Sequence, residues 1–415
     1  MIPNAKHWTL AGTLFLAGVL SAIYLHPDYR MGGGGEPVAI AQSLVERGAF
    51  ADPFIATART GPTAQLPPLY PLFMALILKL FGDGRLLVVF TILVHGLHAS
   101  LLPSLSRLFF KSSAPGIFAG VLSTALPVFV VFPAWDAMYT ATGLILFCLL
   151  TANLTMHAEH DIRSGVLAGI GGALLLLINP ATLTVLLCWM VFLAITKLKE
   201  TPRIVRTCTA FTVALVLGCT PWTIRNYERF HAFVFIRDNF GLALYKSNND
   251  CAQSNLVGNN LSGCADLKSA FNPAETRLIV TLGEVEYNRY RMAAALDWIR
   301  THPKRFAVLT LRRFVEFWYP PHASGIWIIT SLSGLGLLLL LARKDPVGGF
   351  LVAVLATFPG IYYVIESNVR YRYPILWVSL LMAGYALAAL GTSASRIPFV
   401  QQTICRARVK PAPLP

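Results

Sequence analysis

Long apolar runs separated by short polar segments make up most of this chain. A helix needs about 17–25 apolar residues to cross the hydrocarbon core of a bilayer. Runs close to this length recur along the sequence, so the pattern predicts an all-α polytopic membrane protein with about ten transmembrane helices. The expected helices cover residues 8–25, 86–106, 115–134, 137–155, 164–179, 181–196, 207–223, 324–342, 347–365 and 374–392.

Segment 68–82 is an ambiguous apolar run, because the stretch between Pro68 and Gly82 is short for a membrane span. Basic loops collect on the cytoplasmic side of polytopic proteins. Only if residues 68–82 do not cross do the basic loops share a side with Lys6, so we expect a juxtamembrane or re-entrant helix on the outer side. These loops contain Arg107 and Lys111; Lys197, Lys199, Arg203 and Arg206; Arg343 and Lys344; and, in the tail, Arg396, Arg406, Arg408 and Lys410.

This topology divides the chain into four parts. Residues 1–223 form an N-terminal transmembrane module, whose first outer loop, residues 26–85, is the expected catalytic loop. Residues 224–322 form a mixed outer-face region, in which strand-like patches precede amphipathic helices. Residues 323–393 form the C-terminal transmembrane helices, and residues 394–415 form a basic cytoplasmic tail.

Composition agrees with a membrane protein. Hydrophobic residues make up 55% of the chain and charged residues only 13%, whereas a soluble domain has about 25% charged residues. The formal net charge of +14 lies mostly in short loops between apolar runs. Basic loops of this kind orient a membrane protein, so nucleic acid is not an expected partner.

Cys251 and Cys264 are the two cysteines of the outer-face region, and they lie among Gly and Asn residues. A disulfide between them suits an oxidising compartment, whereas the spacing alone also allows two free thiols. The sequence contains no cluster of His and Cys residues with metal-ligand spacing, so no structural or catalytic metal is predicted from motifs.

Several phrases, in order along most of the chain, resemble the membrane glycosyltransferases of the GT-C superfold. The resemblance is to the branch that contains protein O-mannosyltransferases and the lipid A aminoarabinose transferase. The phrases are Glu36 soon after the first span, AIAQSLVERGAF (39–50), TGPTAQLPPLYPLFMALILKLFG (60–82), PWTIRNY (221–227), VFIRDNFGLALYKSNN (234–249), HPKRF (302–306) and VRYRYPI (369–375).

The resemblance implies an enzyme that takes a sugar from a polyprenyl-phosphate carrier and transfers it to a lipid, glycan or protein acceptor. It implies an integral protein of the bacterial inner membrane, surrounded by membrane lipids, whose active site faces the periplasm. No cofactor is required by the resemblance, although a divalent cation held between acidic residues stays open.

Two acidic residues are the candidate catalytic groups. In the family, a carboxylate of the first outer loop acts as general base or positions the acceptor, and Glu36 occupies that position. Asp136, in a short outer turn, resembles the superfold's second acidic site. The alternatives are a helix N-terminal Glu for Glu36 and a helix N-cap for Asp136. The family often has Asp or Asp-Glu where this chain has a glycine run and one Glu, and often a basic residue where this chain has Leu66.

Cations on the outer face are the candidate phosphate contacts, because guanidinium groups match phosphate geometry. Lipid headgroups are the alternative partners of these cations, and an aromatic belt is the alternative role of the two tyrosines that we expect beside the sugar. The candidate substrate residues are Arg225, Arg237, Tyr245, Lys246, Arg370, Tyr371 and Arg372.

Three other functions remain open at this point. A lipid-linked polysaccharide polymerase or ligase also has large outer loops and phosphate-binding arginines. A polytopic transporter is expected to bury ionisable residues near the middle of the membrane, and these spans contain almost none. A non-catalytic membrane scaffold is the third alternative.

Overall fold

The computed structural model describes residues 5–25, 35–55, 57–125, 135–154, 161–196, 201–262, 264, 272–321 and 323–394. Within these ranges the chain is helical, and its only β-type pairings are two isolated bridges, Ala51 with Pro62 and Asn255 with Ser367. The predicted all-α class is therefore confirmed. The glycines at 32–34 and the basic tail from residue 395 lie outside the described residues.

Within the described residues, each predicted membrane-spanning run lies on a helix or a pair of successive helices; residues 126–134 of the run 115–134 lie outside them. The helices are α1 (Ala5–Leu25), α4 (Arg85–Phe110), α5 (Ala114–Ala125), α6 (Ala137–Leu154), α7 (Asp161–Ile178), α8 (Thr182–Thr196), α9 (Thr201–Phe230), α15 (Ser324–Ala342), α16 (Pro346–Thr357), α17 (Gly360–Val364) and α18 (Tyr373–Ala394). By length and composition, five helical stretches can cross a membrane, namely Arg85–Phe110, Pro202–Phe230, Ser324–Ala342, Pro346–Val364 and Val369–Gly391. In the described residues the other predicted spans form shorter apolar helices.

Close backbone contacts hold the apolar helices together around α18. A Cβ atom on Gly336 of α15 would lie 1.9 Å from the Met382 carbonyl oxygen, and one on Gly384 would lie 2.0 Å from the Pro115 carbonyl oxygen. Only glycine allows such an approach, as in other packed membrane helices. Trp377 and its neighbours on α18 are consequently fully buried.

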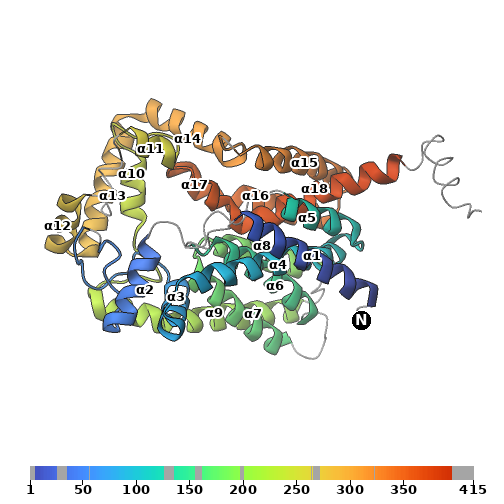
Figure 1. Cartoon of the computed structure of the whole chain (residues 1–415), viewed down its shortest axis with the longest axis horizontal. Coiled ribbons are helices and arrows are strands. Elements are labelled where there is room, and N and C mark those ends of the chain that lie inside the picture. Colours follow the sequence, from blue (N-terminus) through green and yellow to red (C-terminus); the bar gives the residue numbers. More distant parts are fainter. Residues whose placement is uncertain are drawn as a thin grey trace, which may run out of the picture.

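The remaining helices gather toward one end of the molecule's long axis, on the left in Figure 1. They are α2 (Glu36–Arg47), α3 (Leu69–Phe81), α10 (Phe240–Ser247), α11 (Leu256–Leu261), α12 (Pro273–Leu282), α13 (Glu284–Thr301) and α14 (Pro303–Trp318). A short 3₁₀ helix, η2 (Val369–Arg372), precedes α18. The predicted re-entrant segment 68–82 forms α3, which has only 13 residues.

The strand-like patches expected in residues 224–322 are not strands in the described part of that region. Val234 and Ile236 are buried as in a strand, but side chains of α9 take the place of a partner strand. The Asn226 amide donates to the Val234 carbonyl (3.1 Å) and the Trp222 indole donates to the Ile236 carbonyl (3.0 Å). Their carbonyls are therefore satisfied without a sheet.

Candidate active site

A cavity of about 570 Å³ lies where the helices gathered at one end of the molecule meet the apolar ones. It is bordered by α2, the turn between α7 and α8, α10, α17 and the loop before η2, so segments far apart in the sequence form one site. Most of the predicted site residues line it: Glu36, Asp136, Arg237, Lys246, Arg370 and Tyr371.

Packing of Gly35 against Trp135 brings the two predicted acidic residues to one wall. A Cβ atom on Gly35 would lie 3.2 Å from the Trp135 ring, so a larger residue would push the two segments apart. Each of these contact residues immediately precedes an acidic cavity residue, Glu36 or Asp136. The glycine's small size therefore serves close approach of the two loops.

Glu36 begins α2, and Pro37 follows it in the first turn. Among the described residues, none donates a hydrogen bond to the Glu36 carboxylate. Its oxygens are therefore free to accept a proton or a hydrogen bond from a molecule in the cavity.

Asp136 is held firmly in place. Its Oδ2 accepts hydrogen bonds from Thr140 Oγ1 (2.9 Å) and Asn179 Nδ2 (2.9 Å), and its carbonyl accepts from the Thr140 amide (2.8 Å). Its carboxylate therefore joins the first turn of α6 to the turn before α8 through side chains, and Asp136 also lines the cavity. No backbone N–H in the described residues of α6 donates to this carboxylate, as one would in the N-cap role that the sequence left as the alternative. Glu36 is the less constrained of the two carboxylates.

Arg237 lies deep in the molecule, yet its side chain is accessible because it faces the cavity. Its Nε donates to the Gln65 carbonyl oxygen (2.8 Å). The described residues provide no acceptor for its two terminal nitrogens, which leaves them for a ligand. Burial lowers the pKa of the Arg237 guanidinium, and the nearby Tyr371, Asp136 and Glu36 partly oppose that effect; an arginine stays charged even so.

Arg370 is held by an aromatic ring rather than by an acid. Its guanidinium carbon lies 3.5 Å from the centre of the Trp135 ring, a cation–π contact. Its side chain makes no hydrogen bond within the described part of the chain. The next residue, Tyr371, stacks on Tyr362 with ring centres 4.7 Å apart. Arg370 is thus a second cavity cation with unused donors, above the same tryptophan that packs against Gly35.

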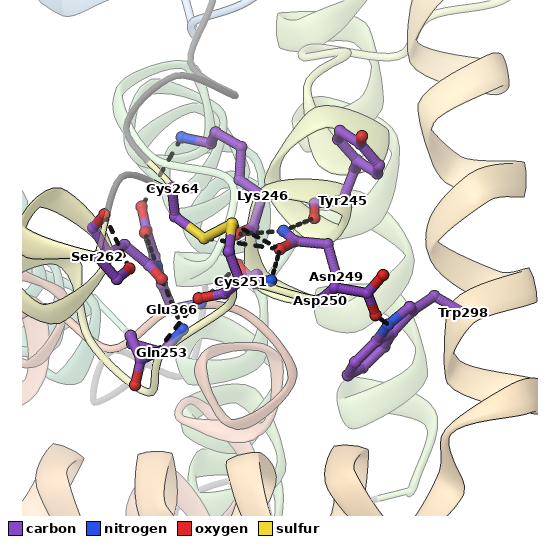
Figure 2. The surroundings of a disulfide bond; sticks show 12 residues. Tyr245, Lys246, Asn249, Asp250, Cys251, Gln253, Ser262, Cys264, Trp298 and Glu366 are labelled. Carbon is purple, nitrogen blue, oxygen red and sulfur yellow. Dashed lines mark hydrogen bonds and ion pairs between the residues drawn. A yellow bond between two sulfur atoms is a disulfide. The ribbon is translucent and has the colours of Figure 1, made fainter.

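Lys246, in the last turn of α10, is the third predicted cation that lines the cavity. Its Nζ lies 3.7 Å from Oε1 of Glu366, an acid that also lines the cavity (Figure 2). Beside this pair, Cys251 and Cys264 form a disulfide with Cα atoms 5.7 Å apart. Of the two alternatives for these cysteines, the structure has the bonded one.

Arg225, Arg372 and Tyr245 do not line the cavity, although the sequence placed them with the substrate residues. Arg372 is buried and donates to the Trp318 carbonyl (2.8 Å) and to side chains of α15 and α18. The Tyr245 ring lies under the guanidinium of Arg291 (4.3 Å). These contacts give both residues a packing role.

Arg225 anchors the strap, which we define as residues 48–55 and 57–68 between α2 and α3. Its guanidinium donates to the carbonyls of Phe50 (2.9 Å) and Thr63 (2.8 Å). The strap continues into Gln65, Leu66 and Pro67, which form part of the cavity wall. Arg225 therefore holds a segment of the cavity wall in place without lining the cavity itself.

Glu284 and Asp238 are two acids near the site that sequence reasoning missed. Glu284 begins α13 and accepts hydrogen bonds from Thr63 Oγ1 (2.5 Å) and the Ala64 amide (2.6 Å), which ties α13 to the strap. Burial raises the pKa of Glu284 to about 8. Burial likewise raises the pKa of Asp238, a cavity residue, to about 6. Asp238 follows Arg237 in a phrase already singled out, whereas no sequence signal marks Glu284.

The described residues do not form a typical metal site, because no three His, Cys, Asp or Glu side chains among them come together as ligands. Glu36 and Asp136 offer two carboxylates at most, and Asp136 already accepts two side-chain hydrogen bonds.

Comparisons with known proteins identify the fold. No protein-family model matches the chain, and no curated protein matches its sequence. The solved oligosaccharyltransferase of Archaeoglobus fulgidus, in complex with zinc and sulfate, matches with a TM-score of 0.56 and 14% identity over 95% of this chain and 51% of its own. AglB of the same organism, in complex with an inhibitory peptide and a dolichol-phosphate, matches with a TM-score of 0.59 and 13% identity over 99% of this chain and 53% of its own.

The chain thus spans about half the length of these archaeal proteins. ArnT from Cupriavidus metallidurans, bound to undecaprenyl phosphate, matches with a TM-score of 0.42 and 14% identity over 94% of this chain and 79% of its own. The assignment of the fold rests on the two archaeal matches. This protein therefore has the fold of the GT-C membrane glycosyltransferases.

Proposed function

We propose that this protein is a membrane glycosyltransferase that takes a sugar from a polyprenyl-phosphate carrier. The acceptor is a lipid, a glycan or a protein on the periplasmic face of the bacterial inner membrane. The observation that carries the proposal is the cavity, which joins Glu36 and Asp136 to two cations with unused hydrogen-bond donors, Arg237 and Arg370.

The cavity suits a sugar phosphate attached to a lipid. Its volume of about 570 Å³ lies within the range of about 300–1,000 Å³ that is common for ligand sites. One part of the wall is apolar and comes from the membrane helices and their connections, with Ile178, Phe358 and Ile361. An isoprenoid chain can follow this wall while its phosphate meets the arginines. AglB, which shares the fold, was solved with a dolichol-phosphate.

The transfer reaction can be assigned to residues of this cavity. The acceptor oxygen attacks the anomeric carbon, and Glu36 takes the proton that the acceptor loses. The bond between the anomeric carbon and the phosphate oxygen breaks, and its electron pair leaves with the phosphate. Arg237 and Arg370 stabilise that charge, and Asp136 orients the acceptor. The products are the glycosylated acceptor and the free polyprenyl phosphate.

A donor panel tests the proposal. Purified protein in lipid is given radiolabelled polyprenyl-phosphate sugars, with extracted membrane lipid and protein as acceptors. Glu36→Gln is compared with Glu46→Gln, which alters an exposed acid on the same helix. We expect transfer from at least one donor by wild type and by Glu46→Gln, and a loss of about 10²–10⁴-fold in Glu36→Gln.

Two results would contradict this proposal in different ways. Transfer that survives in Glu36→Gln removes Glu36 from the role of base. A wild-type protein that uses no monosaccharide donor but accepts a diphosphate-linked oligosaccharide is a polymerase or ligase instead.

A further inference from the structure

Lys246 and Glu366 carry opposite charges, and they have opposite effects on an anionic ligand in the cavity. Both residues line it, and their side chains are 20% and 7% exposed. An anionic ligand is attracted by the lysine and repelled by the carboxylate, and both effects are strong where little water intervenes. Lys246 therefore has two competing partners whenever a phosphate is present.

Lys246 is the partner that can move. Its Nζ lies 3.7 Å from Glu366 Oε1, which is longer than a hydrogen bond. No described residue accepts a hydrogen bond from its ammonium group. The side chain of lysine is also long and flexible, with donors that rotate freely, so it can turn from the carboxylate toward a nearby phosphate.

Glu366, by contrast, is fixed. Its Oε2 accepts a hydrogen bond from Asn259 Nδ2 (2.6 Å), and its backbone amide donates to Ser247 Oγ (2.7 Å). Asn259 is itself held, because its Oδ1 accepts from the Gln253 amide (2.7 Å). Glu366 consequently cannot follow the lysine toward a ligand.

The Cys251–Cys264 disulfide closes the loop that contains Asn259, the hydrogen-bond donor to Glu366. Residues 251–264 form a loop closed by the Cys251–Cys264 bond, and Gln253 and Asn259 lie within it. The loop is also joined to the residue after Glu366, because the Ser367 amide donates to the Ser254 carbonyl (2.8 Å). Figure 2 shows Lys246 and Glu366 beside the disulfide.

We propose that Glu366 is a resident counter-ion that Lys246 exchanges for the phosphate of the carrier, and that this exchange limits how tightly the carrier product is held. The inference rests on the proposed function for the identity of the anion. Glu366 then acts through Lys246 as a positioning residue, and its role is to keep the released polyprenyl phosphate from remaining in the cavity.

The test is the affinity for undecaprenyl phosphate, measured for wild type, Glu366→Gln, Lys246→Met and the double variant. Glutamine keeps an oxygen for Asn259 but removes the charge. We expect Glu366→Gln to bind about tenfold more tightly and Lys246→Met about tenfold more weakly. The gain from Glu366→Gln should shrink in the Lys246→Met background, because interacting residues are not additive.

Glu316→Gln is the matched control. Glu316 accepts hydrogen bonds from Ser254 and Asn255 of the same loop but does not line the cavity. The affinity of Glu316→Gln for undecaprenyl phosphate should therefore equal that of wild type. A kinetic measurement separates the proposed role from simple damage. Glu366→Gln should slow multiple turnovers more than it slows a single turnover, because the main effect is on product release.

The outcomes are distinct. Unchanged or weaker binding by Glu366→Gln overturns this inference and leaves the proposed function standing, whereas a wild type that binds no undecaprenyl phosphate overturns both. If Glu366→Gln does not fold as wild type does, the competition is measured in wild type by acylation of Lys246. Undecaprenyl phosphate must then change the rate at which Lys246 is labelled, and an unchanged rate overturns the inference.

Discussion

The buried acid Glu284 predicts how stability depends on pH. Its folded pKa of about 8 lies above the ordinary value of 4.5, so the folded protein binds more protons than the unfolded chain between these pH values. Stability from this group is complete below about pH 4.5 and is lost as pH rises toward 8. Each pH unit in this window changes the free energy of unfolding by at most about 1.4 kcal/mol.

Glu284→Gln isolates this contribution. A glutamine can still accept the Ala64 amide hydrogen bond and can donate to Thr63, as a protonated glutamate does. At pH 5 the variant and wild type should therefore unfold at nearly the same temperature. At pH 8 the variant should be more stable, by about 3–5 kcal/mol from the pKa difference.

The assay is thermal unfolding in one detergent across pH 5–8, with Glu286→Gln as the control because Glu286 is an exposed acid on the same helix. Taking the difference between each variant and wild type removes the contributions of titrating groups that do not interact with Glu284. Parallel curves for wild type and Glu284→Gln would refute the reasoning, since they would mean that the Glu284 carboxyl titrates normally in the folded protein.

Three further predictions concern the cavity and its loop. Arg237→Lys should raise the KM for the donor about tenfold or more in the transfer assay, because lysine cannot hold the Gln65 carbonyl and still offer two parallel donors; an unchanged KM would exclude Arg237 as a phosphate contact. Arg370→Ala should lower kcat/KM about 10²-fold, measured with saturating acceptor, through loss of charge stabilisation; a change of less than threefold would contradict that role. Replacing both Cys251 and Cys264 by Ala should lower the free energy of unfolding by about 3 kcal/mol, as expected for a short closed loop, and equal melting temperatures for the two proteins would contradict it.

The fold class could be predicted from the sequence because membrane helices are specified locally. Each apolar run, such as residues 374–392, must satisfy its own backbone hydrogen bonds in lipid, and a helix is the structure that does so. The strand-like patch at residues 233–236 misled for the opposite reason. Its alternation of buried and exposed residues is real, but its hydrogen-bond partners are side chains of α9, which no local pattern reveals.

The candidate site was predictable where short phrases carry the chemistry. Glu36, Asp136 and Arg370 all lie in phrases or turns that the sequence marks as outer-face, and the structure brings them to one cavity. Arg372 shows the limit of this reasoning. It lies two residues from Arg370, and the η2 turn directs one side chain to the cavity and the other into the packing of α14, α15 and α18.

The roles of charged residues outside these short phrases could not be predicted from the sequence. Glu284 and Glu366 matter because of partners far away in the chain, the strap in one case and Lys246 in the other. Such pairs depend on how the outer helices pack, and a single sequence contains no direct record of that packing.

The most direct test of the account is a single-turnover measurement with a polyprenyl-phosphate sugar that wild type uses. Wild type and Glu36→Gln are each saturated with the donor, and the rate of sugar transfer is measured together with the affinity for undecaprenyl phosphate. We expect a rate at least about 10²-fold lower in Glu36→Gln, with an affinity no weaker than that of wild type because Arg237 and Arg370 are intact. A Glu36→Gln protein that transfers sugar at the wild-type rate would contradict the assignment of this cavity's chemistry to Glu36.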